Sequence, residues 1–144
     1  MTAEPCGDLD AFGMDASALL RLYLADGPLP PSLEAVMERG CRGAAQLLVP
    51  DLCWLEITSV LSRQISRTLL SAEEALDLLA EIRRLPLRTL ATADLCTAAL
   101  QLNQDHGISV YDACYLALAL RHGATLLTAD GRLQAAALRV GCGG

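Results

Sequence analysis

Four acidic residues of this sequence have the types and positions that could support chemistry: Asp15, Glu56, Asp112 and Asp130. Each lies beside or within a segment that is otherwise mostly apolar. An ionised carboxylate is costly to bury unless it is paired, hydrogen-bonded or neutralised by a cation. Acids in such places are therefore candidates for a catalytic or metal-binding site.

The chemistry that four carboxylates would support is metal-assisted phosphoryl transfer. Like charges about 4 Å apart repel by roughly 4 kcal/mol at an effective dielectric constant near 20, so such a cluster calls for a cation. Oxygen ligands without histidine or thiolate suit Mg²⁺ or Mn²⁺ rather than zinc. A carboxylate-held ion of this kind activates water and stabilises charge on a phosphoryl group, as nucleases and phosphatases require.

Short apolar segments alternate with helical patterns along the chain, and this alternation predicts the fold. Strands are expected over residues 11–14, 47–49, 87–90 and 124–128, and helices over 17–24, 33–39, 51–64, 72–84, 92–105 and 111–121. Ser32 and the capping-box sequence Ser71-Ala-Glu-Glu74 are predicted helix starts, and Gly123 is a predicted helix end. Such alternation is typical of a parallel sheet covered on both faces. We predict a three-layer α/β/α sandwich with a short, mainly parallel central sheet, formed by residues 1–144 as a single domain.

Three of the acids fall where a parallel sheet binds its ligands, beyond the carboxyl ends of the strands. Asp15 and Asp130 each follow a predicted strand, and Asp112 lies in the first turn of a predicted helix. Taken singly, Asp15 or Asp130 could be a helix N-cap and Asp112 a partner of the helix dipole. Taken together, they indicate one acidic site.

Glu56 is the fourth candidate because of its place on the helix expected over residues 51–64. It shares a face with Leu52, Leu55, Ser59 and Val60, an apolar stripe where an acid is not expected to face solvent. An ion pair with Arg63 is the structural alternative.

Composition excludes several classes of protein. All 11 Lys and Arg residues are arginine, which excludes a Walker A loop and a lysine Schiff base. The net charge of −6 argues against simple neutralisation of nucleic-acid phosphates, unless the acids are gathered in one metal site. The six cysteines form no C-x-x-C pair, so free thiols are expected. The sequence shows no membrane span or leader, and we expect a soluble, cytoplasmic protein.

Four segments together resemble the PIN domain family, especially its VapC-type toxins. They are residues 15–20, 50–56, 111–119 and 127–133, in the family's order and spacing. The resemblance implies a Mg²⁺-dependent (or Mn²⁺-dependent) endoribonuclease that acts as the toxin of a toxin–antitoxin module. It also implies an RNA substrate, a cognate antitoxin and a homodimer. The alternative is a catalytically silent PIN-like module for RNA binding or assembly.

The resemblance also implies a role for each candidate residue. Asp15 and Asp112 would be the main metal ligands, Glu56 would bind metal or orient the attacking water, and Asp130 would hold a second metal or water. Ser17 and Thr128 would fix carboxylates or water by hydrogen bonds, with helix capping as the alternative for Ser17. Apart from the resemblance, Arg132 follows Asp130 and could contact RNA phosphates by its charge, with stabilisation of the helix dipole as the alternative.

The chain departs from the family at its first strand. Members usually have a continuous β-branched strand before the first aspartate, whereas here a glycine, Gly13, lies within that segment and extra acids precede it. We therefore expect a short or irregular first strand, which leaves open whether Asp10 enters the acidic site.

Overall fold

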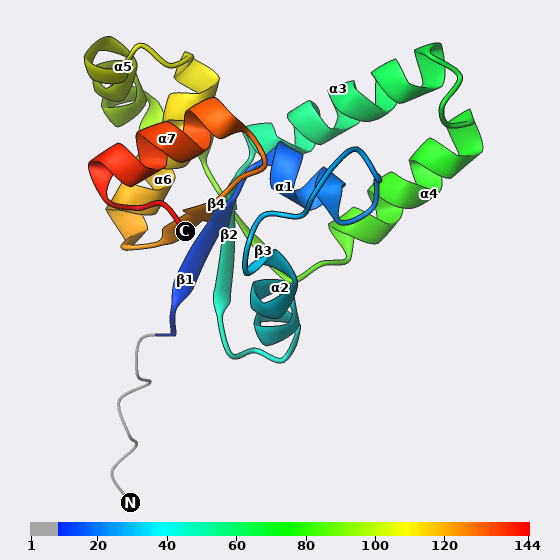
Figure 1. Cartoon of the computed structure of the whole chain (residues 1–144), viewed down its shortest axis with the longest axis horizontal. Helices are drawn as coiled ribbons and strands as arrows, with labels where there is room; N and C mark the ends of the chain where they lie inside the picture. The colour runs from blue at the N-terminus through cyan, green and yellow to red at the C-terminus, as the bar shows by residue number, and fades with distance from the viewer. Residues whose placement is uncertain (1–8) are drawn as a thin grey trace, which may run out of the picture.

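A four-stranded parallel sheet forms the centre of the molecule, with helices on both of its faces (Figure 1). The computed structural model describes residues 9–144. The strands are β1 (Ala11–Met14), β2 (Gln46–Pro50), β3 (Leu87–Leu90) and β4 (Thr125–Leu127). The helices are α1 (Ala16–Arg21), α2 (Leu33–Cys41), α3 (Leu52–Ser66), α4 (Ala72–Arg83), the 3₁₀ helix η1 (Thr92–Leu95), α5 (Cys96–His106), α6 (Val110–His122) and α7 (Gly131–Val140).

The predicted three-layer sandwich is confirmed. Helices α5, α6 and α7 lie on one side of the sheet, and α1, α2, α3 and α4 lie on the other (Figure 1). The strand order is β3-β2-β1-β4, with every neighbouring pair parallel. All four carboxyl ends therefore meet at one edge of the sheet, and β1 lies between β2 and β4 near its middle.

Strand β1 is short, as expected, but it is regular rather than irregular. Phe12 and Gly13 pair in register with β2 on one side and β4 on the other. Gly13 has a packing role, because a Cβ added there would lie 3.2 Å from Cδ2 of Leu118 on α6. A small residue thus lets α6 lie close against the central strand.

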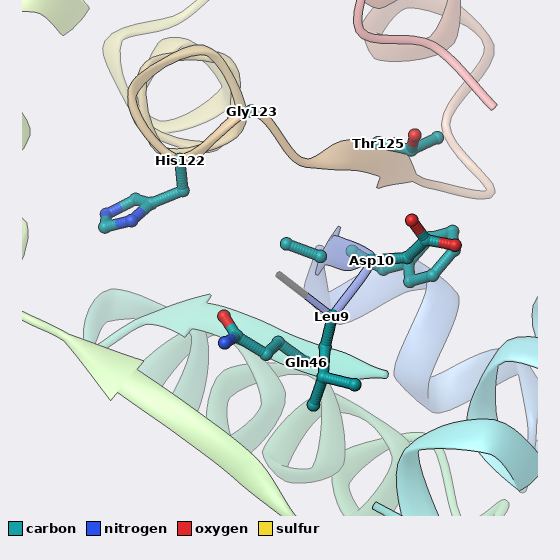
Figure 2. A pocket seen from close by; sticks show the side chains of 8 residues that line it. Leu9, Asp10, Gln46, His122, Gly123 and Thr125 are labelled. Carbon is teal, nitrogen blue, oxygen red and sulfur yellow. The ribbon is translucent and has the colours of Figure 1, made fainter. Parts of the chain in front are cut away.

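Asp10 does not enter the acidic site. It precedes β1, at the amino-terminal end of the strand, and its Oδ2 lies 2.9 Å from Nη2 of Arg39 in an ion pair. It also lines a pocket of about 670 Å³ with His122 and Thr125, which Figure 2 shows beside the starts of the strands. This pocket lies at the opposite end of the sheet from Asp15, which follows Met14.

Helix α6 forms much of the core. Ala113 to Ala119 are all buried, and Tyr115 is only 1% exposed. A helix that is apolar nearly all round is expected when it is covered by both a sheet and a neighbouring helix, as α6 is by the sheet and α5. The predicted end of this helix is confirmed, since Gly123 adopts the left-handed conformation (φ 58°) just before β4.

Some local predictions hold and others do not. The capping box of Ser71 and Glu74 is present at the start of α4. Ser32, in contrast, makes no side-chain cap to α2. The helix expected over residues 92–105 is divided into η1 and α5. The five described cysteines are free thiols, and Cys6 lies outside the described residues. Over residues 9–144, no helix has the length and apolarity needed to cross a membrane.

Replacing Gly13 by valine tests the close contact between β1 and α6. The added methyl groups would force Leu118 to move, and overpacking of this kind costs about 1–3 kcal/mol of unfolding free energy. Urea denaturation measures this loss. Gly131→Ala is the control, because a Cβ there meets no atom within 4 Å. Equal stability of Gly13→Val and the parent protein would contradict the proposed contact.

Candidate active site

Asp15 is a buried carboxylate at the carboxyl end of the central strand. Its side chain is the N-cap of α1, and the residue is 5% exposed. Oδ1 accepts hydrogen bonds from the Ala18 backbone N–H (2.9 Å) and from the Ser17 hydroxyl (2.7 Å). Oδ2 accepts one from the Thr128 hydroxyl (2.6 Å). A carboxylate has about four acceptor positions, so these three bonds leave about one for a further ligand.

The hydroxyls of Ser17 and Thr128 connect Asp15 to the turn after β4. While donating to Asp15, Ser17 accepts from the Ala129 backbone N–H (3.0 Å), and Thr128 accepts from the Asp130 backbone N–H (3.0 Å). The cap of α1 is Asp15, so the capping alternative for Ser17 is wrong. Both hydroxyls instead hold a carboxylate, which agrees with the role that the resemblance implied.

Asp112 and Asp130 each lie at the start of a helix. Asp112 is in the first turn of α6, where Ser109 is the N-cap and accepts from the Asp112 backbone N–H (3.0 Å). Asp130 caps α7, its Oδ1 accepting from the backbone N–H groups of Arg132 and Leu133. Asp130 is therefore a helix N-cap, as its structural alternative predicted. This does not exclude a second role, since the cap uses only one carboxylate oxygen.

Glu56 reaches the site from α3. Its Oε1 accepts a hydrogen bond from the hydroxyl of Tyr115 at 2.6 Å. The expected apolar stripe around it is partly wrong, because Leu55 is 75% exposed. The expected ion pair with Arg63 is also not formed, and the Arg63 guanidinium donates instead to the Ser59 hydroxyl.

All four acids line a single pocket of about 260 Å³. We call it the acidic pocket, and define it by its lining residues Asp15, Ala16, Ser17, Leu20, Glu56, Ser59, Val60, Arg63, Asp112, Tyr115 and Asp130. The sheet thus brings together acids from β1, α3, α6 and the turn after β4. Thr128 and Arg132 are not among the residues that line it.

Burial and mutual repulsion make Asp15, Glu56 and Asp112 harder to ionise. The pKa of Asp15 is raised mainly by burial, against hydrogen bonds that lower it, and the nearby Asp112 raises it further. Burial also raises the pKa of Glu56, with smaller contributions from Asp15 and Asp112. The pKa of Asp112 is raised by burial and then by Asp130. The negative charges of these acids repel one another, and a bound cation would relieve this repulsion.

The donor set fits a hydrated Mg²⁺ or Mn²⁺ ion. Among the described residues, no three His, Cys, Asp or Glu side chains form a preformed metal-binding group. Mg²⁺ does not need such a group, since it commonly keeps several waters and uses one or two protein carboxylates. Asp15, Glu56 and Asp112 could each supply one, because all three are partly desolvated and line the acidic pocket.

Comparison with known proteins gives the family. The model of the PIN domain matches residues 14–138, which include all four acids. The chain belongs to the PIN domain family. Ribonuclease VapC3 of Pyrobaculum aerophilum is 34% identical to this PIN domain over 122 residues, which are 83% of this chain and 89% of that protein.

Solved structures share the fold of this PIN domain. PAE2754 of Pyrobaculum aerophilum has a TM-score of 0.68 at 21% identity, covering 91% of this chain and 83% of that chain. VapBC2 of Rickettsia felis, solved with a DNA fragment from its promoter, has a TM-score of 0.61 at 14% identity, covering 81% of this chain and 85% of that chain.

Sequence reasoning missed two residues of this pocket. Tyr115 was not singled out, although it follows Asp112 by three positions and so shares its face of α6. The sequence suggested Arg63 only as an alternative ion-pair partner of Glu56, and the structure places it in the wall of the acidic pocket. The spacing of Tyr115 from Asp112 on one helix is visible in the sequence. Its hydrogen bond to Glu56 on α3 is visible only in the structure.

The raised pKa of Asp15 predicts how stability depends on pH. Because the folded chain resists ionisation of Asp15, the ionised form costs folding free energy above the folded pKa, and this cost disappears below the unfolded pKa. In EDTA, the urea midpoint of Asp15→Asn, measured relative to that of the parent protein, should therefore be higher near neutral pH than in the acidic range. The control is Asp77→Asn on the exposed surface of α4. A difference in midpoint that does not change with pH would contradict the assignment.

Proposed function

We propose that this PIN domain is a metal-dependent endoribonuclease and the toxin of a toxin–antitoxin module. The observation that carries the proposal is the meeting of Asp15, Glu56, Asp112 and Asp130 around one pocket at the carboxyl edge of the sheet. The similarity to Ribonuclease VapC3, which extends over most of both chains, supports RNA as the substrate.

In this proposal some of the acids bind the metal ion and another orients the attacking water. Asp15 and Asp112 would hold Mg²⁺ or Mn²⁺, with Ser17 and Thr128 keeping the Asp15 carboxylate in place. The ion, when bound, would lower the pKa of a water molecule and offset the charge of the scissile phosphate. Glu56, held by Tyr115, would orient the attacking water.

Asp130 has a supporting place in this mechanism. It would bind a second ion or a water through the carboxylate oxygen that does not cap α7. Arg132 begins the same helix and would contact an RNA phosphate. Its guanidinium suits this task because it stays charged and presents several donors in one plane.

An antitoxin and a second copy of the chain are the proposed protein partners. VapBC2 of Rickettsia felis, which shares the fold, supports the antitoxin. The homodimer follows from the family resemblance.

Cleavage of RNA with and without metal tests the proposal. The protein should cleave RNA in Mg²⁺ or Mn²⁺ and lose this activity in EDTA, with recovery when the metal is restored. Asp15→Asn and Asp112→Asn should each lower the rate by about 100-fold or more, because each removes a charged metal ligand. Gel analysis of labelled RNA measures the rate.

Asp77→Asn is the matched control, since it removes an exposed carboxylate on α4. It should cleave like the parent protein. Cleavage that persists in EDTA, or in both site variants, would refute the proposed chemistry. RNA binding without any cleavage in metal would favour the silent module instead.

A double-mutant cycle tests Tyr115 as a positioning residue for Glu56. Tyr115→Phe removes only the hydroxyl and should slow cleavage by about 10-fold. In a Glu56→Gln background it should have little further effect, because the group that it positions is already altered. Tyr111→Phe, at a residue that is 67% exposed, is the control on the same helix. Equal rate losses in both backgrounds would show that Tyr115 does not act through Glu56.

A further inference from the structure

A second pocket adjoins the acidic pocket and shares one residue, Asp112, with it. It has a volume of about 380 Å³ and lies between α7 and the junction of α5 with α6. We call it the α7 groove, and define it by its lining residues His106, Gly107, Ile108, Ser109, Asp112, Arg132, Ala135 and Arg139. Because Asp112 lines both pockets, a polymer strand bound at the acidic pocket can continue into the α7 groove.

The α7 groove is richer in positive charge than the acidic pocket. Arg132, Ala135 and Arg139 are spaced three and four positions apart, which places them along one face of α7. Both arginines are exposed. Over residues 9–144 the ion pair between Arg39 and Asp10 is the single one formed, so neither arginine of the groove is neutralised by a carboxylate.

Two further donors lie on the opposite wall. His106 is in the last turn of α5 and presents an imidazole to the groove. Ser109 uses its hydroxyl oxygen to accept from the Asp112 backbone N–H, which leaves the hydroxyl hydrogen available to donate. The groove therefore offers donors from both walls and one carboxylate at its border with the acidic pocket.

We propose that the α7 groove binds the phosphodiester backbone of the RNA beside the cleaved bond, with Arg132 and Arg139 as the phosphate contacts. This inference depends on the proposed ribonuclease function, and it adds Arg139 and His106 to Arg132. A planar guanidinium can donate two parallel N–H hydrogen bonds to two oxygens of one phosphate, and it remains charged at all relevant pH values. The groove also explains how a chain of net charge −6 can bind a polyanion, because its positive groups are gathered where the strand would leave the acids.

The salt dependence of RNA binding tests this proposal. The probe is a fluorescein-labelled, single-stranded RNA of mixed sequence, bound to the Asp15→Asn protein in Mg²⁺ so that it is not cleaved. Anisotropy titrations at several salt concentrations give the dissociation constant and its slope. Arg132→Ala and Arg139→Ala should each weaken binding several-fold and lower the slope of log affinity against log salt by about 0.7, the value for one contact to a single-stranded phosphate.

Two matched variants complete the experiment. Arg42→Ala, at an exposed arginine after α2, should leave affinity and slope unchanged. Arg139→Lys should keep the slope, because it retains the charge, while losing part of the affinity. If Arg139→Ala binds RNA like Arg42→Ala, the proposal is overturned.

Cleavage by the parent protein separates this proposal from the proposed function. If the parent protein cleaves RNA in metal but the arginine variants bind like the control, the α7 groove is not the phosphate site and the ribonuclease function stands. If the parent protein does not cleave but the arginine variants lose affinity and slope as expected, the ribonuclease function fails and the groove remains a phosphate-binding site.

Discussion

The arrangement of this molecule depends on one buried carboxylate. Asp15 ends the central strand, is almost fully covered, and is held by three hydrogen bonds from Ser17, Ala18 and Thr128. The charge would be costly to bury without these donors. These hydrogen bonds stabilise the fold, because they start α1 and attach the turn after β4 to the end of β1. The same bonds also fix the orientation of the Asp15 carboxylate in the acidic pocket.

The other acids are placed relative to Asp15 by the sheet and by α6. Parallel pairing of β1 with β4 brings Thr128 and Asp130 beside Asp15, although more than a hundred residues separate them. Helix α6 packs closely on β1 because Gly13 has no side chain, and this contact fixes the position of Asp112 and Tyr115. Tyr115 then reaches Glu56 on α3 across the site. The acidic pocket is thus formed at the junction of both helical layers with the sheet edge.

Much of this arrangement was predictable because strong local signals agreed with one another. The alternation of apolar strands and helices gave the layers, and the rule that ligands bind at the carboxyl ends of parallel strands selected Asp15, Asp112 and Asp130. The glycine-terminated end of α6 was equally clear. Prediction from local sequence failed where one residue type is compatible with two different structural roles. Ser17 could cap a helix or hold a carboxylate, and Gly13 could disturb a strand or admit a neighbouring helix.

The sequence by itself determined the kinds of side chain available: four acids at element ends, arginine as the only strong cation, and a helix apolar enough to be buried on nearly every side. Only the tertiary structure decided which of these groups meet. It placed Asp10 outside the acidic pocket and brought the Tyr115 hydroxyl to Glu56. It also placed Arg132 and Arg139 in one groove with His106 on the opposite wall. The physical reason is that local propensity acts over a few residues, whereas these contacts depend on strand order and helix packing between distant segments.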